Sequence, residues 1–178
     1  MSDFASAIKT VILVHEGGFQ KRADDPGNWT PAGELKGTKF GVSAATFPNE
    51  DIEGLTINRA EDLYRQRWGM FSLLSDQQVL TKVLDLAVNM ENGGHGPATV
   101  ILQNSVNTLG GNVVVDGAFG QKTADAANAL DPNQLLAQLC TDAEAHYKAL
   151  EAKRPQMSAW FKNWDGRAAW MPPQETAA

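Results

Sequence analysis

Apolar residues recur at helical spacing along most of the chain. In residues 3–16 they return every three or four positions, and the pair Gly17-Gly18 follows. The same period appears in later segments, several of which end at glycine or follow a capping residue. We expect helices at residues 3–16, 58–71, 75–87, 98–106, 121–130, 132–150 and 158–170. The pattern predicts a mainly α protein with about six to eight helices.

Two of these helix starts carry the capping-box pattern, in which a small polar residue is followed three positions later by Glu or Gln. Asn58 precedes Glu61 in one of them, and Ser75 precedes Gln78 in the other. We therefore expect Asn58 and Ser75 to be the N-cap residues.

The segment from Phe19 to Phe40 has no sustained period and contains several glycines and prolines. A stretch of this length without regular structure is usually functional in a compact domain. We expect a long irregular loop that could include a small hairpin. A second break, rich in glycine, lies at residues 93–97 and is the nearest feature to a domain boundary.

Composition and charge exclude several classes of protein. The chain of 178 residues has 15 Lys and Arg against 21 Asp and Glu, a net charge of −6, which argues against nucleic acid as a partner. The one cysteine, Cys140, excludes an internal disulfide and a multi-cysteine zinc site, and its apolar helical setting predicts a buried, inert thiol. No pair of histidines has zinc-ligand spacing, so we predict no metal site.

The longest apolar run, residues 11–14, is too short to span a bilayer, so no stable membrane insertion is expected. Asp3 stands ahead of Lys9, and no small-residue cleavage site follows the apolar run. This start is not typical of a secretory signal. We expect synthesis in the cytoplasm without a cleavable signal peptide.

Glu16 is the first candidate for chemistry. It falls in the last turn of the first predicted helix, where the negative end of the helix dipole raises the proton affinity of a carboxylate. A raised proton affinity suits a general acid. The alternative is a solvated surface glutamate beside a glycine C-cap.

The irregular loop supplies acids that could act with Glu16. Glycoside hydrolysis uses two carboxylates, one to protonate the leaving oxygen and one to act as nucleophile or to activate water. Asp25 and Glu34 are the candidates for the second carboxylate, although Asp25-Pro26-Gly27 is also a favourable turn sequence. Trp29 and Phe40 could stack on sugar faces or anchor the loop to the core.

Three motifs in this region resemble those of glycoside hydrolase family 108, and they stand at 16–19 (Glu-Gly-Gly-Phe), 25–27 (Asp-Pro-Gly) and 38–43 (Thr-Lys-Phe-Gly-Val-Ser). The resemblance implies a lysozyme-like helical fold, and an N-acetylmuramidase in which Glu16 is the general acid. Residues 28–37 form a longer insert than the family's shorter forms carry. Thr38 aligns with the motif threonine, which could orient a water or the glutamate, or be a structural hydroxyl.

The second half resembles the peptidoglycan-binding region that accompanies this family, on the motifs at 85–89, 101–103, 115–120 and 163–164. Asn89, near the glycine-rich break, is a candidate contact to sugar amide groups. We expect a catalytic region at 1–92, a peptidoglycan-binding-like helical region packed on it at 93–172, and a tail at 173–178.

The resemblance implies an endolysin-like hydrolase that cleaves the β-1,4 bond after N-acetylmuramic acid in peptidoglycan glycan strands, without a cofactor. Such an enzyme acts on the cell wall after release, and a holin or a secretion system would provide that release. The alternatives are a lytic transglycosylase on the same bond, a chitin-cleaving enzyme, and a non-catalytic wall-binding or phage structural module.

Overall fold

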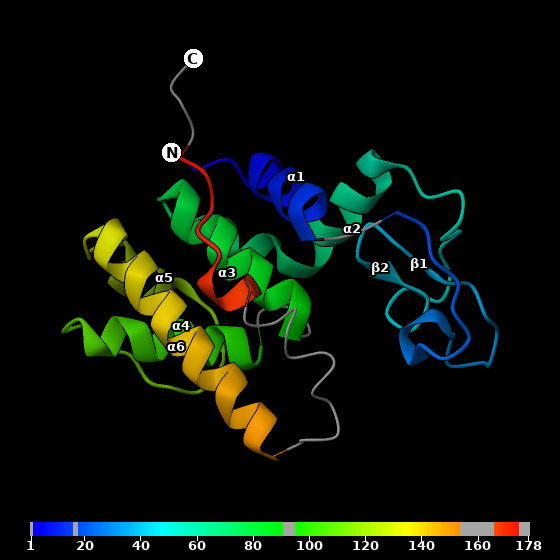
Figure 1. Ribbon diagram of the computed structural model, residues 1–178. Coiled ribbons are helices and arrows are strands. Elements are labelled where there is room, and N and C mark those ends of the chain that lie inside the picture. The colour runs from blue at the N-terminus through cyan, green and yellow to red at the C-terminus, as the bar shows by residue number, and fades with distance from the viewer. Residues whose placement is uncertain (1, 16–17, 91–94, 154–165, 175–178) are drawn as a thin grey trace. The chain divides into compact units, whose positions relative to one another are not determined.

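A computed structural model of the chain describes residues 2–15, 18–90, 95–153 and 166–174 (Figure 1). It confirms the mainly α fold. In chain order the elements are α1 (Phe4–His15), η1 (Pro26–Asn28), β1 (Thr38–Lys39), β2 (Val42–Ser43), α2 (Ile57–Trp68), η2 (Gly69–Leu73), α3 (Gln77–Met90), α4 (Pro97–Thr108), α5 (Gln121–Asn128) and α6 (Pro132–Lys153). None of the described helices is long and apolar enough to cross a membrane.

The chain divides into two compact units. One is residues 8–67, and the other combines residues 1–7 with residues 68–178. The change of unit therefore falls at the end of α2.

The unit of residues 8–67 holds the irregular segment and a small hairpin, as expected. β1 pairs antiparallel with β2, with Thr38 opposite Ser43 and Lys39 opposite Val42. Apolar side chains of α1, of the hairpin and the loop after it, and of α2 are buried; they are Ile8, Val11, Ile12, Val42, Ala44, Ile52, Leu55, Ala60, Leu63 and Tyr64. The buried apolar residues of this unit thus come from loop residues and from two helices.

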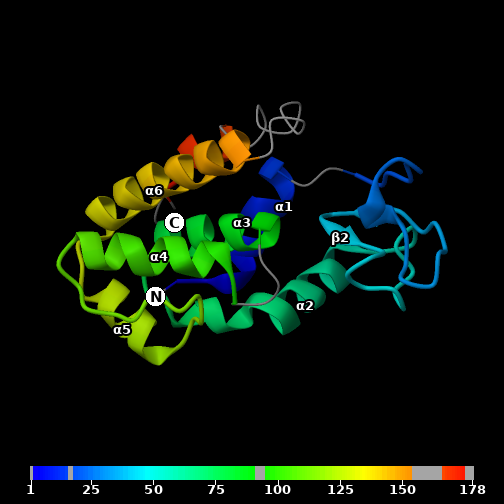
Figure 2. The ribbon, with the colours of Figure 1, turned by 90° about the horizontal axis from the view of Figure 1, so that it is seen from below.

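The second unit is a helical bundle. Helices α3, α4 and α6 lie side by side in both views (Figures 1 and 2) and pack against one another. In α3 every residue from Val79 to Ala87 is buried, as expected for a helix that is surrounded by others. Phe71 of η2 meets Phe119 ahead of α5 in an edge-to-face contact, with ring centroids 4.7 Å apart.

Both predicted N-caps are wrong by one or two residues. The hydroxyl of Thr56, not the side chain of Asn58, caps α2 by accepting from the Arg59 N–H at 3.2 Å. Asp76, not Ser75, caps α3 by accepting from the Val79 N–H at 2.9 Å. A polar residue stands at several positions near each helix start, so the capping-box spacing alone did not choose between them.

A buried lysine attaches the C-terminal segment to α3. Lys82 is fully buried, and its Nζ donates to the carbonyl oxygens of Arg167 at 2.7 Å, Ala168 at 2.8 Å and Trp170 at 2.9 Å. Beside it, Arg167 Nε lies 3.1 Å from Asp85 Oδ1 in a buried ion pair. Burial lowers the pKa of Lys82 because the charged form is desolvated. The three carbonyls offset that cost by solvating the ammonium.

Two further expectations fall in this region. Of the helix expected at 158–170, residues 158–165 lie outside the described residues, while residues 166–169 are helical. Cys140 on α6 is half-buried, where a buried thiol was expected, and the burial that it has raises the pKa of the thiol.

The lysine contact predicts a large effect of one substitution on stability. Lys82→Met keeps the length of the side chain but leaves three carbonyls without their donor, so we expect unfolding to become easier by about 3 kcal/mol. Lys148→Met, at an exposed lysine on α6, is the matched control and should change stability by less than about 0.5 kcal/mol. Denaturant unfolding measures both variants, and equal midpoints would refute the role of Lys82.

Candidate active site

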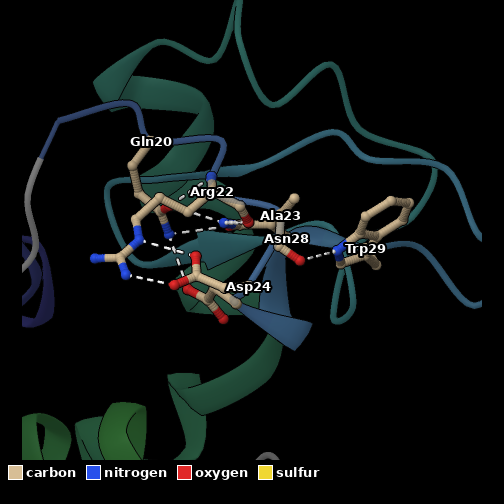
Figure 3. Close-up of polar contacts among 7 residues, drawn as sticks. Gln20, Arg22, Ala23, Asp24, Asn28 and Trp29 are labelled. Carbon is tan, nitrogen blue, oxygen red and sulfur yellow. Dashed lines mark hydrogen bonds and ion pairs between the residues drawn. The ribbon is translucent and has the colours of Figure 1, made fainter.

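The irregular segment is organised around the side chain of Asn28, which is fully buried. Its Oδ1 accepts from Thr38 Oγ1 at 2.7 Å and from Gln20 Nε2 at 2.9 Å. Its Nδ2 donates to Gln20 Oε1 at 2.7 Å and to the Arg22 carbonyl at 2.8 Å (Figure 3). Every hydrogen-bonding position of this amide is therefore used.

The backbone of Asn28 closes the insert that follows it. Its carbonyl accepts from the N–H of Lys36 at 2.9 Å and of Gly37 at 3.0 Å. Inside the loop, the Thr30 N–H donates to the Glu34 carbonyl at 2.8 Å. Residues 28–37 thus form a closed loop whose two ends meet at Asn28, so the insert need not disturb the segments on either side.

Asp25 lies one turn ahead of Asn28 and is held in place. Its Oδ1 accepts from the Gly27 N–H at 2.8 Å, which caps η1, and its Oδ2 accepts from Gln20 Nε2 at 3.0 Å. The residue is half-buried. A carboxylate fixed by two donors and still reachable by solvent has the placement that an active-site acid requires.

The neighbouring acid differs from Asp25. Asp24 is exposed and forms a two-point ion pair with Arg22, at 2.6 Å and 3.0 Å (Figure 3). The hydrogen bond from Arg22 lowers the pKa of Asp24. An acid whose proton affinity is reduced by its own partner is a poor general acid.

Glu34 is exposed at the far end of the closed loop, with Lys36 Nζ 3.6 Å from its Oε2. It lines a hollow of about 360 Å³ with other acids of residues 50–53. Asp25, Trp29 and Phe40 are not among the residues that line this hollow. Among the described residues, Glu34 and Asp25 therefore share neither this hollow nor a hydrogen bond.

Two aromatic candidates lie near this network. The indole N–H of Trp29 donates to the Ala23 carbonyl at 3.0 Å, while 37% of the residue remains exposed (Figure 3). The tryptophan is thus anchored at its nitrogen and still offers surface. Both of the sequence interpretations, anchoring and stacking, fit this placement.

Phe40 occupies the tip of the hairpin in an unusual conformation. Its φ is +52°, and Gly41 follows with φ +73°, as in the two-residue turns that twist with a hairpin. Such turns favour Asn-Gly, and the left-handed conformation costs a phenylalanine about 1 kcal/mol. The hydroxyl of Tyr64 donates to the Phe40 carbonyl at 3.0 Å and helps to hold the turn. Strain of this kind is often kept where a side chain has a function.

The remaining candidates stand as follows. Glu16 lies outside the described residues. The Thr38 hydroxyl is engaged with Asn28, as in the structural interpretation of that residue. Asn89 belongs to the other unit, where its Oδ1 accepts from the Tyr147 hydroxyl at 2.8 Å. Burial raises the pKa of Tyr147, so this hydroxyl stays a donor.

The sequence interpretation missed Gln20 and Asn28, the two amides that position Asp25 and Thr38. Neither belongs to a periodic pattern, and neither can act as acid, base or nucleophile. The available signal was Asn28 directly after Asp25-Pro26-Gly27, where a turn brings side-chain amides close to backbone groups.

Two segments of the chain match known protein families. Residues 9–90 match the family model of glycosyl hydrolase 108, and residues 97–169 match that of a predicted peptidoglycan domain. A solved structure of SagA from Brucella abortus matches with a TM-score of 0.63 and 24% identity, over 97% of each chain. At this identity the likeness shows the fold alone. A search of curated proteins gave no match.

The two family models define a hydrolase that acts on peptidoglycan. Residues 9–90 are a glycosyl hydrolase 108 segment, and residues 97–169 are the predicted peptidoglycan domain. Asp25, Asn28 and Thr38 all lie inside the hydrolase segment.

The close approach of residue 37 to the backbone of Gln20 predicts that Gly37 cannot be replaced. Its φ is +94°, and a Cβ there would lie 2.4 Å from the Gln20 carbonyl oxygen, which accepts from Thr38. Gly37→Ala should therefore separate Gln20 from Thr38, lower the melting temperature by several degrees and reduce wall hydrolysis.

Gly33→Ala is the matched control. Gly33 also has a positive φ, +83°, but a Cβ there would meet nothing within 4 Å. This variant should cost only backbone strain, about 1 kcal/mol, and keep its activity. Thermal unfolding and wall solubilisation compare the two, and equal behaviour of both variants would show that the close approach at Gly37 is unimportant.

Proposed function

We propose that the protein is an N-acetylmuramidase with Glu16 as general acid and Asp25 as second carboxylate. The observation that carries the proposal is the fixed, half-buried carboxylate of Asp25, in a segment that matches a family of glycosyl hydrolases. The match to a peptidoglycan domain supports the wall as substrate. The position of Glu16 in the Glu-Gly-Gly motif supports its role as acid.

Asp25 is preferred to Glu34 because the two carboxylates are held differently. Asp25 accepts two hydrogen bonds, from Gly27 and Gln20, whereas Glu34 is exposed beside a lysine. A catalytic group that is already held in position is more effective, because no free energy is needed to order it in the transition state.

In the proposed reaction Glu16 donates its proton to the glycosidic oxygen as the bond from that oxygen to C1 breaks. Positive charge develops on the N-acetylmuramic acid ring, and the Asp25 carboxylate stabilises it or removes a proton from the attacking water. The water oxygen bonds to C1, and the product is a new reducing end. Where Asp25 only stabilises the charge, the proton of the water passes to Glu16; where Asp25 takes that proton, exchange with solvent returns both carboxyl groups to their starting states.

The proposed sugar contacts are Trp29, Phe40 and Asn89. Trp29 and Phe40 have exposed or half-exposed rings on short, hydrogen-bonded turns, which suits stacking on a sugar face. Asn89 would contact a sugar amide. Thr38 supports the site indirectly, since its hydroxyl holds Asn28.

Three substitutions of similar shape test the assignment. Glu16→Gln removes the proton donor and Asp25→Asn removes the second charge, so each should lower wall hydrolysis by roughly 10²–10⁴-fold. Glu34→Gln is the matched control and should keep nearly full activity. Release of reducing ends from purified peptidoglycan measures all three.

Circular dichroism and sedimentation with insoluble wall separate loss of chemistry from loss of fold or binding. The inactive variants should remain folded and bound to the wall. Full activity of Glu16→Gln would reject the general acid, and a loss confined to Glu34→Gln would transfer the second role from Asp25 to Glu34. Wall binding without any hydrolysis by the natural protein would support a non-catalytic module instead.

A further inference from the structure

The helical unit contains a hollow of about 940 Å³ between residues 112–118 and α5. It lies within the segment that matches the predicted peptidoglycan domain, and neither that match nor the proposed catalytic chemistry assigns a role to it. Its walls come from a loop and a helix that are both tied to α4, so its shape is part of the fold.

One buried amide holds the loop. Gln103 of α4 is 1% exposed, and its Nε2 donates to Asp116 Oδ1 at 2.8 Å. Its Oε1 accepts from the N–H groups of Asp116 at 3.1 Å and Gly117 at 2.9 Å. At the start of the loop, Asn107 Nδ2 donates to the Val113 carbonyl and Oδ1 accepts from the Val113 N–H, at 2.9 Å and 2.8 Å. A wall fixed in this way loses little entropy when a ligand binds.

The apolar part of the lining is made of small side chains. Val113, Val114, Ala118 and Ala126 contribute to it, and the described residues that line the hollow include no aromatic ring. Val114 is 75% exposed, which is unusual for a valine on a rigid loop. Small apolar side chains match methyl groups, whereas a sugar face is usually bound by an aromatic ring.

The charged part of the lining carries both signs. Asp116 and Asp125 supply carboxylates, and Lys122 supplies an ammonium group. The N–H of Ala118 donates to Asp116 Oδ1 at 2.9 Å and lowers the pKa of this carboxyl group. A ligand that complements the hollow therefore has methyl groups, an amino group and a carboxylate.

We propose that this hollow binds the peptide stem of peptidoglycan, and not its glycan. The stem is a short peptide with alanine methyl groups, the free amino group of a diamino acid and several free carboxylates. The methyl groups would contact Val114 and its neighbours, the ammonium would pair with the two aspartates, and one of the carboxylates would pair with Lys122, with the others left in solvent. The inference rests on peptidoglycan as the substrate of the proposed function, and it adds which part of that polymer this unit recognises.

The test uses the full chain and a ligand that contains no glycosidic bond. Isothermal titration with the free stem tetrapeptide L-Ala-γ-D-Glu-meso-diaminopimelyl-D-Ala should show binding. Any heat from peptide-free glycan should be the same for the natural chain and for variants of this hollow. Val114→Ser and Lys122→Glu should each weaken peptide binding by about fivefold or more.

Two neighbours supply matched controls. Val115 is also exposed, at 43%, but does not line the hollow, and Lys148 is an exposed lysine on α6. Val115→Ser and Lys148→Glu should bind the peptide like the natural chain. Equal affinities in all four variants, no binding of the peptide, or glycan binding that Val114→Ser abolishes would each overturn the proposal. Because the peptide is not hydrolysed, failure here leaves wall hydrolysis by the natural protein intact and separately measurable.

Discussion

The buried amide of Asn28 is the interaction on which the candidate site depends. It takes two hydrogen bonds and gives two, and its own carbonyl takes two more from the end of the insert. A buried amide that loses a partner costs about 1–3 kcal/mol, so these bonds form or fail together. These hydrogen bonds connect segments of the chain that belong to no common helix and have almost no sheet pairing.

This arrangement explains how an irregular segment can hold an acid in one place. In a helix or a sheet the backbone ladder fixes the side chains, but residues 18–37 have only isolated bridges and one short turn of helix. Side-chain amides replace the ladder. Gln20 contacts both Asn28 and Asp25, so the same network that satisfies the buried amide also positions the carboxylate. The strained turn at Phe40 is tolerated because Tyr64 donates to the Phe40 carbonyl, and because Thr38, in the first strand of the hairpin, donates to Asn28 and to Gln20.

The parts of the fold that the sequence predicted are those in which one residue type repeats. Apolar periodicity located the helices because burial of one face is a property of many residues at once. The exact caps at Thr56 and Asp76 escaped prediction, since each depends on a single hydrogen bond among several polar neighbours. Asp25, Trp29 and Phe40 could be named as candidates because their side chains have recognisable chemistry, whereas Gln20 and Asn28 contribute only through the hydrogen bonds that they form. The hollow at residues 112–118 was also missed, because it depends on Gln103 lying beneath a loop distant in sequence.

The two halves of the chain divide the work on one polymer in this account, with cleavage in the hydrolase segment and recognition in the peptidoglycan domain. The most direct test of the central claim is the mass of the fragments released from purified peptidoglycan, measured after reduction with borohydride. The account predicts fragments that end in reduced N-acetylmuramic acid. Fragments that end in reduced N-acetylglucosamine, or in an anhydro sugar that is lighter by one water and resists reduction, would contradict it.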